Sequence, residues 1–258
     1  MLRPTKLLAR KIRHRLRPSQ RKSHLEYSGP FESWELAVAS SVGYDAPYAL
    51  KKVRDGVESV LKKEKAYERD GTSFEQMPEK YTLRTHIKKL LKKDSVIVDF
   101  GGGLGGTFLN NADLFSSDWI GNYFVVEQPS FCETGREMAY KYSLPVVFVS
   151  DLREIPQTPS IAIFSGVLQY IEYWHQVVGA IIAKEPTHIL VDRQPLTSGD
   201  TQIYVQENDG YYEKKVSYPS RIINKKEFLT AFSGYTVVEE WKSDFDPDDH
   251  LGFLMNAT

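Results

Sequence analysis

Residues 96–106 read VIVDFGGGLGG, an apolar run rich in β-branched residues followed by five glycines in six positions. The apolar run predicts a buried strand, and the glycines at 101–106 predict a tight turn that leads from it into a helix. Glycine adopts positive φ without strain and has no Cβ, so such a turn lets a ligand approach the main chain closely. We therefore interpret residues 101–106, called the glycine turn below, as the binding turn for a nucleotide-type ligand.

The glycine turn fits two cofactor motifs. Read from Gly101, it matches G-x-G-x-x-G, which is typical of dinucleotide-binding folds; read from Asp99, it matches D-x-G-x-G-x-G, the first motif of S-adenosylmethionine methyltransferases. Both kinds of fold also have an acidic residue at the end of the second strand that accepts hydrogen bonds from a ribose, and Glu127 has this position. The turn and Glu127 therefore leave both cofactors open.

From residue 96 onward the chain alternates between strand-like and helix-like segments, which predicts parallel βαβ units with helices on both faces of a sheet. The strand-like segments are 96–100, 123–128, 146–151, 160–166 and 188–194. Two more, 235–241 and 250–256, are joined by a loop too short for a parallel crossover. We therefore predict an α/β, Rossmann-like fold with a mostly parallel seven-stranded sheet and an antiparallel terminal hairpin.

Helical segments precede the first of these strands, and we predict that residues 29–94 form an N-terminal helical layer. Ser33 and Asp45 are the expected N-caps of its first two helices, and its third helix is expected over 78–93. Dinucleotide folds usually begin with the glycine strand. Helices ahead of that strand, together with the terminal hairpin, therefore favour S-adenosylmethionine for the cofactor-binding domain, residues 95–258.

An insertion interrupts this domain between its fifth strand and the following helix. Residues 196–223 contain Asp209-Gly210 between alternating residues, which predicts a β-hairpin. The insertion leaves the sheet at the carboxyl end of a strand, the edge where open α/β sheets bind ligands. We therefore predict that it acts as a lid over the site.

The composition is that of a globular protein, because 41% of the 258 residues are hydrophobic, enough for a sizeable core. The single cysteine, Cys132, excludes a disulfide within the chain and fits a reducing compartment. No apolar run approaches the ~20 residues that span a bilayer, and the N-terminus lacks the apolar region of a secretory signal. The expected location is therefore cytoplasmic.

The N-terminal arm, residues 1–28, is basic: residues 1–22 hold nine of the 33 Lys and Arg residues and none of the 34 acidic residues. Leu8, Ile12 and Leu16 would form one apolar stripe on a helix, as in segments that lie on anionic membranes at the inner face. The alternative is a disordered, solvated tail. Nucleic acid is not expected as a partner, because the rest of the chain offers no second basic face.

Seven segments along the chain together resemble a known family. They are FESWELAVASSVGYD (31–45), ERDG (68–71), VDFGGGLGG (98–106), VVEQP (125–129), SGVLQYIE (165–172), VDRQPLT (191–197) and YPSRI (218–222). In this order they resemble methyltransferases often encoded near surface-polysaccharide and lipopolysaccharide biosynthesis genes. The resemblance implies a class I methyltransferase fold that binds S-adenosylmethionine. It names no acceptor, and a sugar of a surface glycan or its precursor is a hypothesis that rests on it.

The resemblance also implies which residues contact the cofactor. Those expected around its methionine part are Asp99, Gly101, Gly102, Gly103 and Gly105, with Glu127 at the ribose.

The resemblance implies further contacts at the ends of the third and fourth strands. Asp151 and Leu152, after the third strand, are expected at the adenine, although a surface cap is an equal interpretation of Asp151. The fourth strand ends at Ser165 and Gly166, and the segment just beyond, up to Tyr170, is expected to face the transferred methyl group.

Methyl transfer from a sulfonium depends mainly on positioning, with a base needed when the acceptor is a hydroxyl. The catalytic candidates are Asp192, Arg193, His175 and Tyr170, and His250 is a further candidate base. Asp192 and Arg193 form either a base beside an orienting guanidinium or a structural ion pair. His175 is alternatively a packed histidine with no role in catalysis.

The acidic run from Asp244 to His250 contains oxygen ligands for a hard cation, but its spacing is not that of a calcium loop. We interpret it as a solvated turn and predict no metal. Two other functions remain open: an NAD-dependent sugar-nucleotide enzyme, and a non-catalytic partner protein in glycan assembly.

Overall fold

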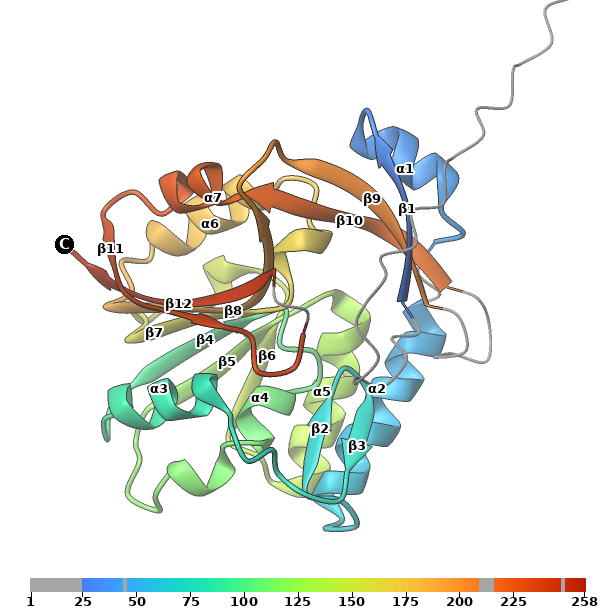
Figure 1. Ribbon diagram of the computed structural model, residues 1–258. Helices are drawn as coiled ribbons and strands as arrows, with labels where there is room; N and C mark the ends of the chain where they lie inside the picture. Colours follow the sequence, from blue (N-terminus) through green and yellow to red (C-terminus); the bar gives the residue numbers. More distant parts are fainter. Residues whose placement is uncertain (1–24, 44–45, 209–215, 247–248) are drawn as a thin grey trace, which may run out of the picture.

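The computed structural model describes residues 25–43, 46–208, 216–246 and 249–258 (Figure 1). Five parallel strands form the centre of its large sheet, in the spatial order β8-β7-β4-β5-β6. They are β4 (Val96–Phe100), β5 (Asn122–Val126), β6 (Val146–Val149), β7 (Ile161–Ser165) and β8 (His188–Thr197). The chain runs from β4 to β6 on one side and then returns to β7 on the other. The switch point, where such sheets bind ligands, therefore lies at the end of β4.

The predicted terminal hairpin is confirmed. β11 (Tyr235–Lys242) pairs antiparallel with β12 (His250–Ala257), and β12 pairs antiparallel with β8. These seven strands are the mostly parallel sheet that the sequence predicts.

The predicted number of strands, however, is wrong: the sequence predicts seven, and the described sheet has ten. The added strands are β1 (Leu25–Phe31), β9 (Gln202–Asn208) and β10 (Val216–Asn224). β9 and β10 confirm the predicted hairpin in the insertion, whose Asp209-Gly210 turn lies outside the described residues. β10 continues from β8 through two parallel residue pairs, and β1 pairs antiparallel with β9. Figure 1 shows this extension projecting from the end of β8, away from β4 to β6.

β1 differs most from the expectation, because the predicted boundary between the N-terminal arm and the helical layer falls inside this strand. Its Gly29-Pro30 dipeptide reads as a turn in the sequence. In the sheet the proline falls at the register irregularity between Ser28 and Phe31, on an edge strand where the lost N–H is tolerated. Because the insertion lies within the sheet, its role as a lid stays a prediction.

The N-terminal layer contains helices and one short hairpin that the sequence did not predict. The helices are α1 (Trp34–Ser40), α2 (Ala46–Leu61) and α3 (Thr82–Leu90), and the hairpin is β2 (Tyr67–Arg69) with β3 (Thr72–Phe74). Ser33 caps α1 as predicted, whereas Asp45 lies outside the described residues. α3 begins four residues later than expected, where the Asp244 side chain accepts the Thr82 N–H at 2.6 Å.

Helices cover both faces of the sheet (Figure 1). α6 (Trp174–Ile182) and α7 (Lys225–Ala231) cover one face. The other face is covered by α3, α4 (Gly106–Leu109) and α5 (Pro129–Tyr142), and α2 packs outside α5. Three 3-10 turns complete the domain: η1 (Ala112–Leu114), η2 (Leu152–Glu154) and η3 (Leu168–Tyr170).

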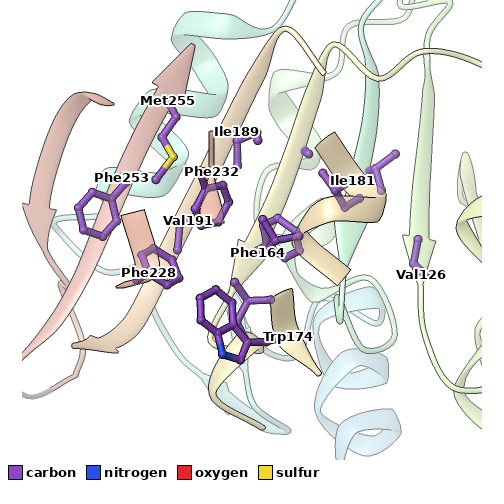
Figure 2. Close-up of a cluster of buried hydrophobic side chains, with 14 of the residues drawn as sticks. Val126, Phe164, Trp174, Ile181, Ile189, Val191, Phe228, Phe232, Phe253 and Met255 are labelled. Carbon is purple, nitrogen blue, oxygen red and sulfur yellow. The ribbon is translucent and has the colours of Figure 1, made fainter. Parts of the chain in front are cut away.

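An aromatic core lies between the sheet and the α6–α7 layer (Figure 2). The Trp174 and Phe228 rings stack with centroids 5.7 Å apart, and Phe228 also packs on Phe232 and Phe253. Each fully buried side chain of this size stabilises the fold by roughly 1.5–3 kcal/mol. This packing holds β7 and β8 in place and so fixes the positions of the site residues at the carboxyl end of β7 and in the middle of β8.

Candidate functional site

The glycine turn begins directly after β4, at the switch point of the sheet. Gly101, Gly103 and Gly105 have φ angles of 72°, 58° and 86°, in the left-handed region that favours glycine. The Gly101 N–H donates to the Val126 carbonyl at 2.9 Å, which ties the turn to the end of β5. The backbone conformation therefore requires glycine, as the sequence indicates.

Neighbouring segments enclose the glycine turn on two sides. A Cβ at Gly101 would overlap the side chain of Val167, in the loop after β7. A Cβ at Gly103 would lie 3.8 Å from Val53 of α2, which is ordinary contact. The turn thus lies between the end of β7 and the N-terminal layer.

Asp99 is buried at the base of the turn. The Tyr123 hydroxyl donates a hydrogen bond to Asp99 Oδ2 at 3.0 Å. Burial raises the pKa of Asp99 to about 6, and the neighbouring Tyr123 and Thr107 side chains oppose the rise. A Cβ at Gly102 would overlap the carboxylate. Asp99 therefore supports the turn from below, and its expected place at the methionine part of the cofactor stays a prediction.

Glu127 follows β5 and reaches over the same turn. One carboxylate oxygen accepts the Gly103 N–H at 3.2 Å, and the other accepts the Gln128 N–H at 2.8 Å. Burial raises the pKa of Glu127. The structure therefore brings Glu127 to the glycine turn, as expected of a residue that holds a ribose.

Asp151 caps the η2 turn at the end of β6. Its side chain accepts the Arg153 N–H at 2.8 Å and pairs with the Arg153 guanidinium. Hydrogen bonds from Arg153 lower the pKa of Asp151 to about 2. The surface-cap interpretation is therefore correct, whereas an adenine contact by Asp151 or by the half-buried Leu152 stays a prediction.

The carboxyl end of β7 meets the middle of β8 beside the turn. Ser165 pairs with Asp192 in the sheet, and the Gly166 N–H donates to the Asp192 carbonyl at 2.9 Å. Gly166 has a φ of 64°, and a Cβ there would lie 3.3 Å from the guanidinium carbon of Arg193. Gly166 therefore leaves room for Arg193 to cross the end of β7.

Asp192 and Arg193 do not form the ion pair that the sequence left open. The Arg193 guanidinium donates instead to Asp246, at 2.9 Å, and to both carboxylate oxygens of Asp70. Burial alone would lower the pKa of Arg193, but the two aspartates raise it well above its ordinary value. Arg193 therefore joins the β2–β3 turn to the loop between β11 and β12.

Asp192 points toward β11 and is buried. Its Oδ1 accepts the indole N–H of Trp241 at 3.1 Å, and within the described residues its Oδ2 has no hydrogen-bond donor. Burial raises the pKa of Asp192 to about 6, against the opposing effect of Arg193. Asp192 thus retains an open acceptor oxygen in the middle of β8, level with the carboxyl end of β7.

Tyr170 lies where the extension meets the central sheet. Its hydroxyl donates to Gln206 Oε1 of β9 at 3.1 Å, and Tyr27 of β1 donates to the same oxygen at 3.2 Å. The Tyr170 ring packs edge-on against Tyr218 of β10, with centroids 5.3 Å apart. The insertion therefore contributes directly to the surroundings of Tyr170.

The two candidate histidines make other contacts. His175 lies on α6 with Nε2 3.2 Å from Glu227 of α7, and it lines an open groove of about 440 Å³ between these helices. His250 pairs with the neighbouring Asp249 at 2.9 Å. The described contacts of His175 thus lie within the α6–α7 layer.

The sequence singles out Arg69 and Asp70 as part of an N-terminal layer that either closes over the cofactor or simply docks on the sheet, but it does not single out Glu68. All three residues belong to the β2–β3 hairpin. Glu68 is only 5% exposed and lies against the glycine turn, and Asp70 binds Arg193. The available signal for Glu68 is the ERDG segment, whose three charged residues in a row precede a glycine, but nothing local shows that this hairpin packs on the turn.

The acidic run is not a simple solvated turn. Asp244 binds Thr82 and Lys80, and Asp246 binds Arg193 and Ser243, whereas Asp248 lies outside the described residues. Within the described residues, no three His, Cys, Asp or Glu side chains are grouped as a metal site requires. None of the described helices combines the length and apolar composition needed to cross a bilayer.

Comparison with known proteins places the fold. No family model and no curated protein matches the sequence. Among solved structures, the chain is similar to an S-adenosylmethionine-dependent methyltransferase from Clostridium acetobutylicum, at 9% identity and a TM-score of 0.50, over 69% of this chain and 92% of that one. It is also similar to 1,6-didemethyltoxoflavin-N1-methyltransferase from Burkholderia thailandensis, at 14% identity and a TM-score of 0.49, over 84% and 92%. At such identities the first likeness shows the fold alone, and the chain therefore has a Rossmann-like methyltransferase fold.

Proposed function

We propose that this protein is an S-adenosylmethionine-dependent methyltransferase. The observation that carries the proposal is the charge around the glycine turn, where Asp99, Glu127 and Glu68 all have pKa values raised by burial. Buried carboxylates gain stability from a cationic ligand, because it replaces the water that their charge has lost. S-adenosylmethionine carries a sulfonium and an ammonium and fits this environment.

The same environment disfavours the NAD-dependent alternative. A dinucleotide places its pyrophosphate at the glycine turn and at the start of the following helix. Here that position faces a carboxylate, because a Cβ on Gly106, the first residue of α4, would overlap Oε2 of Glu68. Two like charges in a desolvated site repel each other strongly.

The cofactor would supply the methyl group on its sulfonium, and the residues of the chain would hold both reactants. We propose that the glycine turn holds the methionine part and Glu127 the ribose, with Asp151 and Leu152 near the adenine. The end of β7, Ser165 and Gly166, would then border the space for the acceptor. Such positioning supplies most of the acceleration in a transfer of this kind.

We assign proton removal to Asp192 among the four candidates. It keeps an open carboxylate oxygen, and a pKa of about 6 leaves it mostly ionised at neutral pH. The charge of Arg193 is taken up by two aspartates, and the hydroxyl of Tyr170 by Gln206. His175 is engaged with Glu227 in the helix layer.

The acceptor that we propose is a sugar hydroxyl in a surface glycan or its precursor. This part rests on the family resemblance, and the groups near Tyr170 are compatible with it. Tyr27, Tyr170, Gln206 and Tyr218 form a neutral network of hydroxyls, an amide and aromatic rings. Such groups suit an uncharged polyol.

The cofactor is tested by calorimetric titration of the protein with S-adenosylhomocysteine and with NAD. We expect binding of the first and none of the second, and binding of NAD alone would refute the proposal. Activity is tested by transfer of a labelled methyl group from S-adenosylmethionine to nucleotide sugars and glycolipid precursors. Cofactor binding without transfer to any hydroxyl acceptor would instead favour the non-catalytic alternative.

We further propose a cytoplasmic protein that residues 1–22 bring to the inner face of an anionic membrane. These residues lie outside the described part of the chain, so their charge alone supports the proposal. The test compares the full chain with one that begins at Ser23, which leaves β1 whole. We expect only the full chain to bind vesicles containing phosphatidylserine, and to lose binding in high salt. Equal binding by the two chains would refute the proposal.

A further inference from the structure

The structure places a buried carboxylate against the glycine turn, on the short hairpin that sequence analysis left unassigned. Glu68 of β2 is 5% exposed. Its main chain is fixed by Asn110 at the end of α4, which accepts the Glu68 N–H at 3.1 Å and donates to the Glu68 carbonyl at 2.7 Å. Glu68 Oε1 accepts the Gly71 N–H at 2.6 Å. The side chain therefore has one defined position.

Two glycines on other elements make room for this side chain. A Cβ on Gly106 would overlap Glu68 Oε2, and a Cβ on Gly56, within helix α2, would lie 3.3 Å from Glu68 Cγ and 3.0 Å from the Gly71 carbonyl. Glycine inside a helix costs about 1 kcal/mol relative to alanine. The fold accepts this cost at Gly56, next to a carboxylate that is itself expensive to bury.

The other two carboxylates at the turn are held differently. Asp99 is 1% exposed, lies against Gly102 and accepts from the Tyr123 hydroxyl, whereas both oxygens of Glu127 accept backbone N–H groups. Glu68 Oε2 has neither a hydrogen-bond donor nor an ion-pair partner within the described residues. Glu68 Oε2 therefore keeps an acceptor position at the turn that a ligand cation can bind.

We infer that Glu68 binds the α-ammonium of the cofactor's methionine part, an inference that rests on the proposed function. An ammonium both neutralises the carboxylate and donates the hydrogen bond that Oε2 lacks, whereas a sulfonium can only do the first. The ammonium contact at the methionine part, where the sequence leads us to expect Asp99, is thereby assigned to Glu68. Asp99 instead supports the turn from within the sheet.

The charges around Glu68 add a proton linkage to this contact. Burial raises the pKa of Glu68 to about 7, and the nearby charge of Asp70 adds to the rise. The Gly71 N–H, Arg193 and Arg69 all oppose this rise. Near neutral pH the free protein therefore holds a proton on part of its Glu68 population. An ammonium selects the ionised form, so cofactor binding should release that proton.

The test uses Glu68→Gln, which keeps an oxygen for the Gly71 N–H and removes the charge. The control is Glu64→Gln, at an exposed position of the same segment. The two probes are S-adenosylhomocysteine, which has the ammonium, and 5′-methylthioadenosine, which lacks the amino-acid part. Charged hydrogen bonds are worth about 1.5–3 kcal/mol, or roughly 10- to 100-fold in affinity.

At about pH 7.5 we expect Glu68→Gln to bind S-adenosylhomocysteine roughly 10- to 100-fold more weakly than the wild type does. The same variant should bind 5′-methylthioadenosine with the wild-type affinity. Glu64→Gln should bind both normally. If Glu68→Gln lowers the affinity for both probes equally, or for neither, the inference is wrong while the proposed function stands. Failure of the wild type to bind S-adenosylhomocysteine would refute both.

Proton release supplies a readout that does not depend on a folded variant. Titrations of the wild type at about pH 6.5, in two buffers of different ionisation enthalpy, give the protons released per ligand bound. We expect more release with S-adenosylhomocysteine than with 5′-methylthioadenosine, and the difference should vanish in Glu68→Gln. Equal release with the two ligands in the wild type would overturn the inference.

Discussion

The ion pairs of Arg193 should differ sharply in strength, and a double-mutant cycle can measure the difference. The Arg193 side chain is 17% exposed; its partner Asp246 is 19% exposed, whereas its partner Asp70 is 55% exposed. Ion pairs with an exposed partner are usually worth 0.2 to about 1 kcal/mol, because water and salt screen them. We therefore expect at most about 1 kcal/mol of coupling between Arg193 and Asp70, despite its two hydrogen bonds.

The pKa of Asp246 gives the expected size of the coupling free energy between Arg193 and Asp246, the more buried of the two pairs. Burial alone would raise it, but Arg193, His250 and two hydrogen bonds lower it from 3.8 to about 2. A depression of this size corresponds to about 2 kcal/mol of stability at neutral pH. Because the folded-state pKa is the lower one, this stabilisation is present above about pH 4 and is lost as the pH falls through about 2.

The assay is urea unfolding of the wild type, Arg193→Met, Asp246→Asn, Asp70→Asn and the two double variants. We expect a coupling free energy of about 2 kcal/mol for Arg193 with Asp246 at neutral pH, and clearly less at about pH 3. The exposed pair of Lys51 and Asp55, four residues apart on α2, is a control expected to give about 0.3–0.5 kcal/mol. A stronger coupling with Asp70 than with Asp246, or one that does not change with pH, would show that the reasoning from exposure and pKa is wrong.

Three other predictions concern single positions. Because the pKa of Asp192 is raised to about 6, the free energy of unfolding should fall as the pH rises from about 4 to 6. In urea titrations, Asp192→Asn should make this fall smaller. The same substitution should reduce the rate of methyl transfer by about 10²–10⁴-fold. Gly101→Ala should abolish binding of S-adenosylhomocysteine in calorimetry, because the added Cβ would overlap Val167. The control is Gly179→Ala, whose added Cβ meets nothing within 4 Å. This control should bind the ligand normally and be at least as stable as the wild type. Phe228→Ala should lower the free energy of unfolding by about 3–5 kcal/mol, and a loss below 1 kcal/mol would contradict the packing of the aromatic core.

The central sheet could be predicted because its determinants are local. Each parallel strand is a short apolar run, and the glycine turn requires its glycines through backbone conformation and contact with the next loop. The antiparallel hairpin followed from the length of a single loop. Glu127 was found for the same reason, since the end of a strand fixes its position relative to the turn.

The extension and the β2–β3 hairpin could not be predicted because their partners are far away in sequence. β1 pairs with β9 across about 175 residues, as in the pair Tyr27 and Gln206. Its sequence, LEYSGPF, contains a glycine and a proline that locally favour a turn. Glu68 is buried because Gly56 and Gly106 leave space for it, and no local pattern relates these three positions.

Two residues of the site, Asp70 and Arg193, share an unusual backbone conformation. Asp70 and Arg193 have φ angles of 53° and 59°, in the left-handed region that non-glycine residues seldom adopt, and their side chains bind each other. Strain of this kind persists only where the surroundings determine the conformation, and it is common at functional sites. This pair joins the hairpin that carries Glu68 to the strand that carries Asp192. This ion pair therefore links the hairpin proposed to bind the cofactor ammonium to the strand proposed to remove the proton, and a change at Asp70 should alter both cofactor affinity, measured by calorimetry, and turnover.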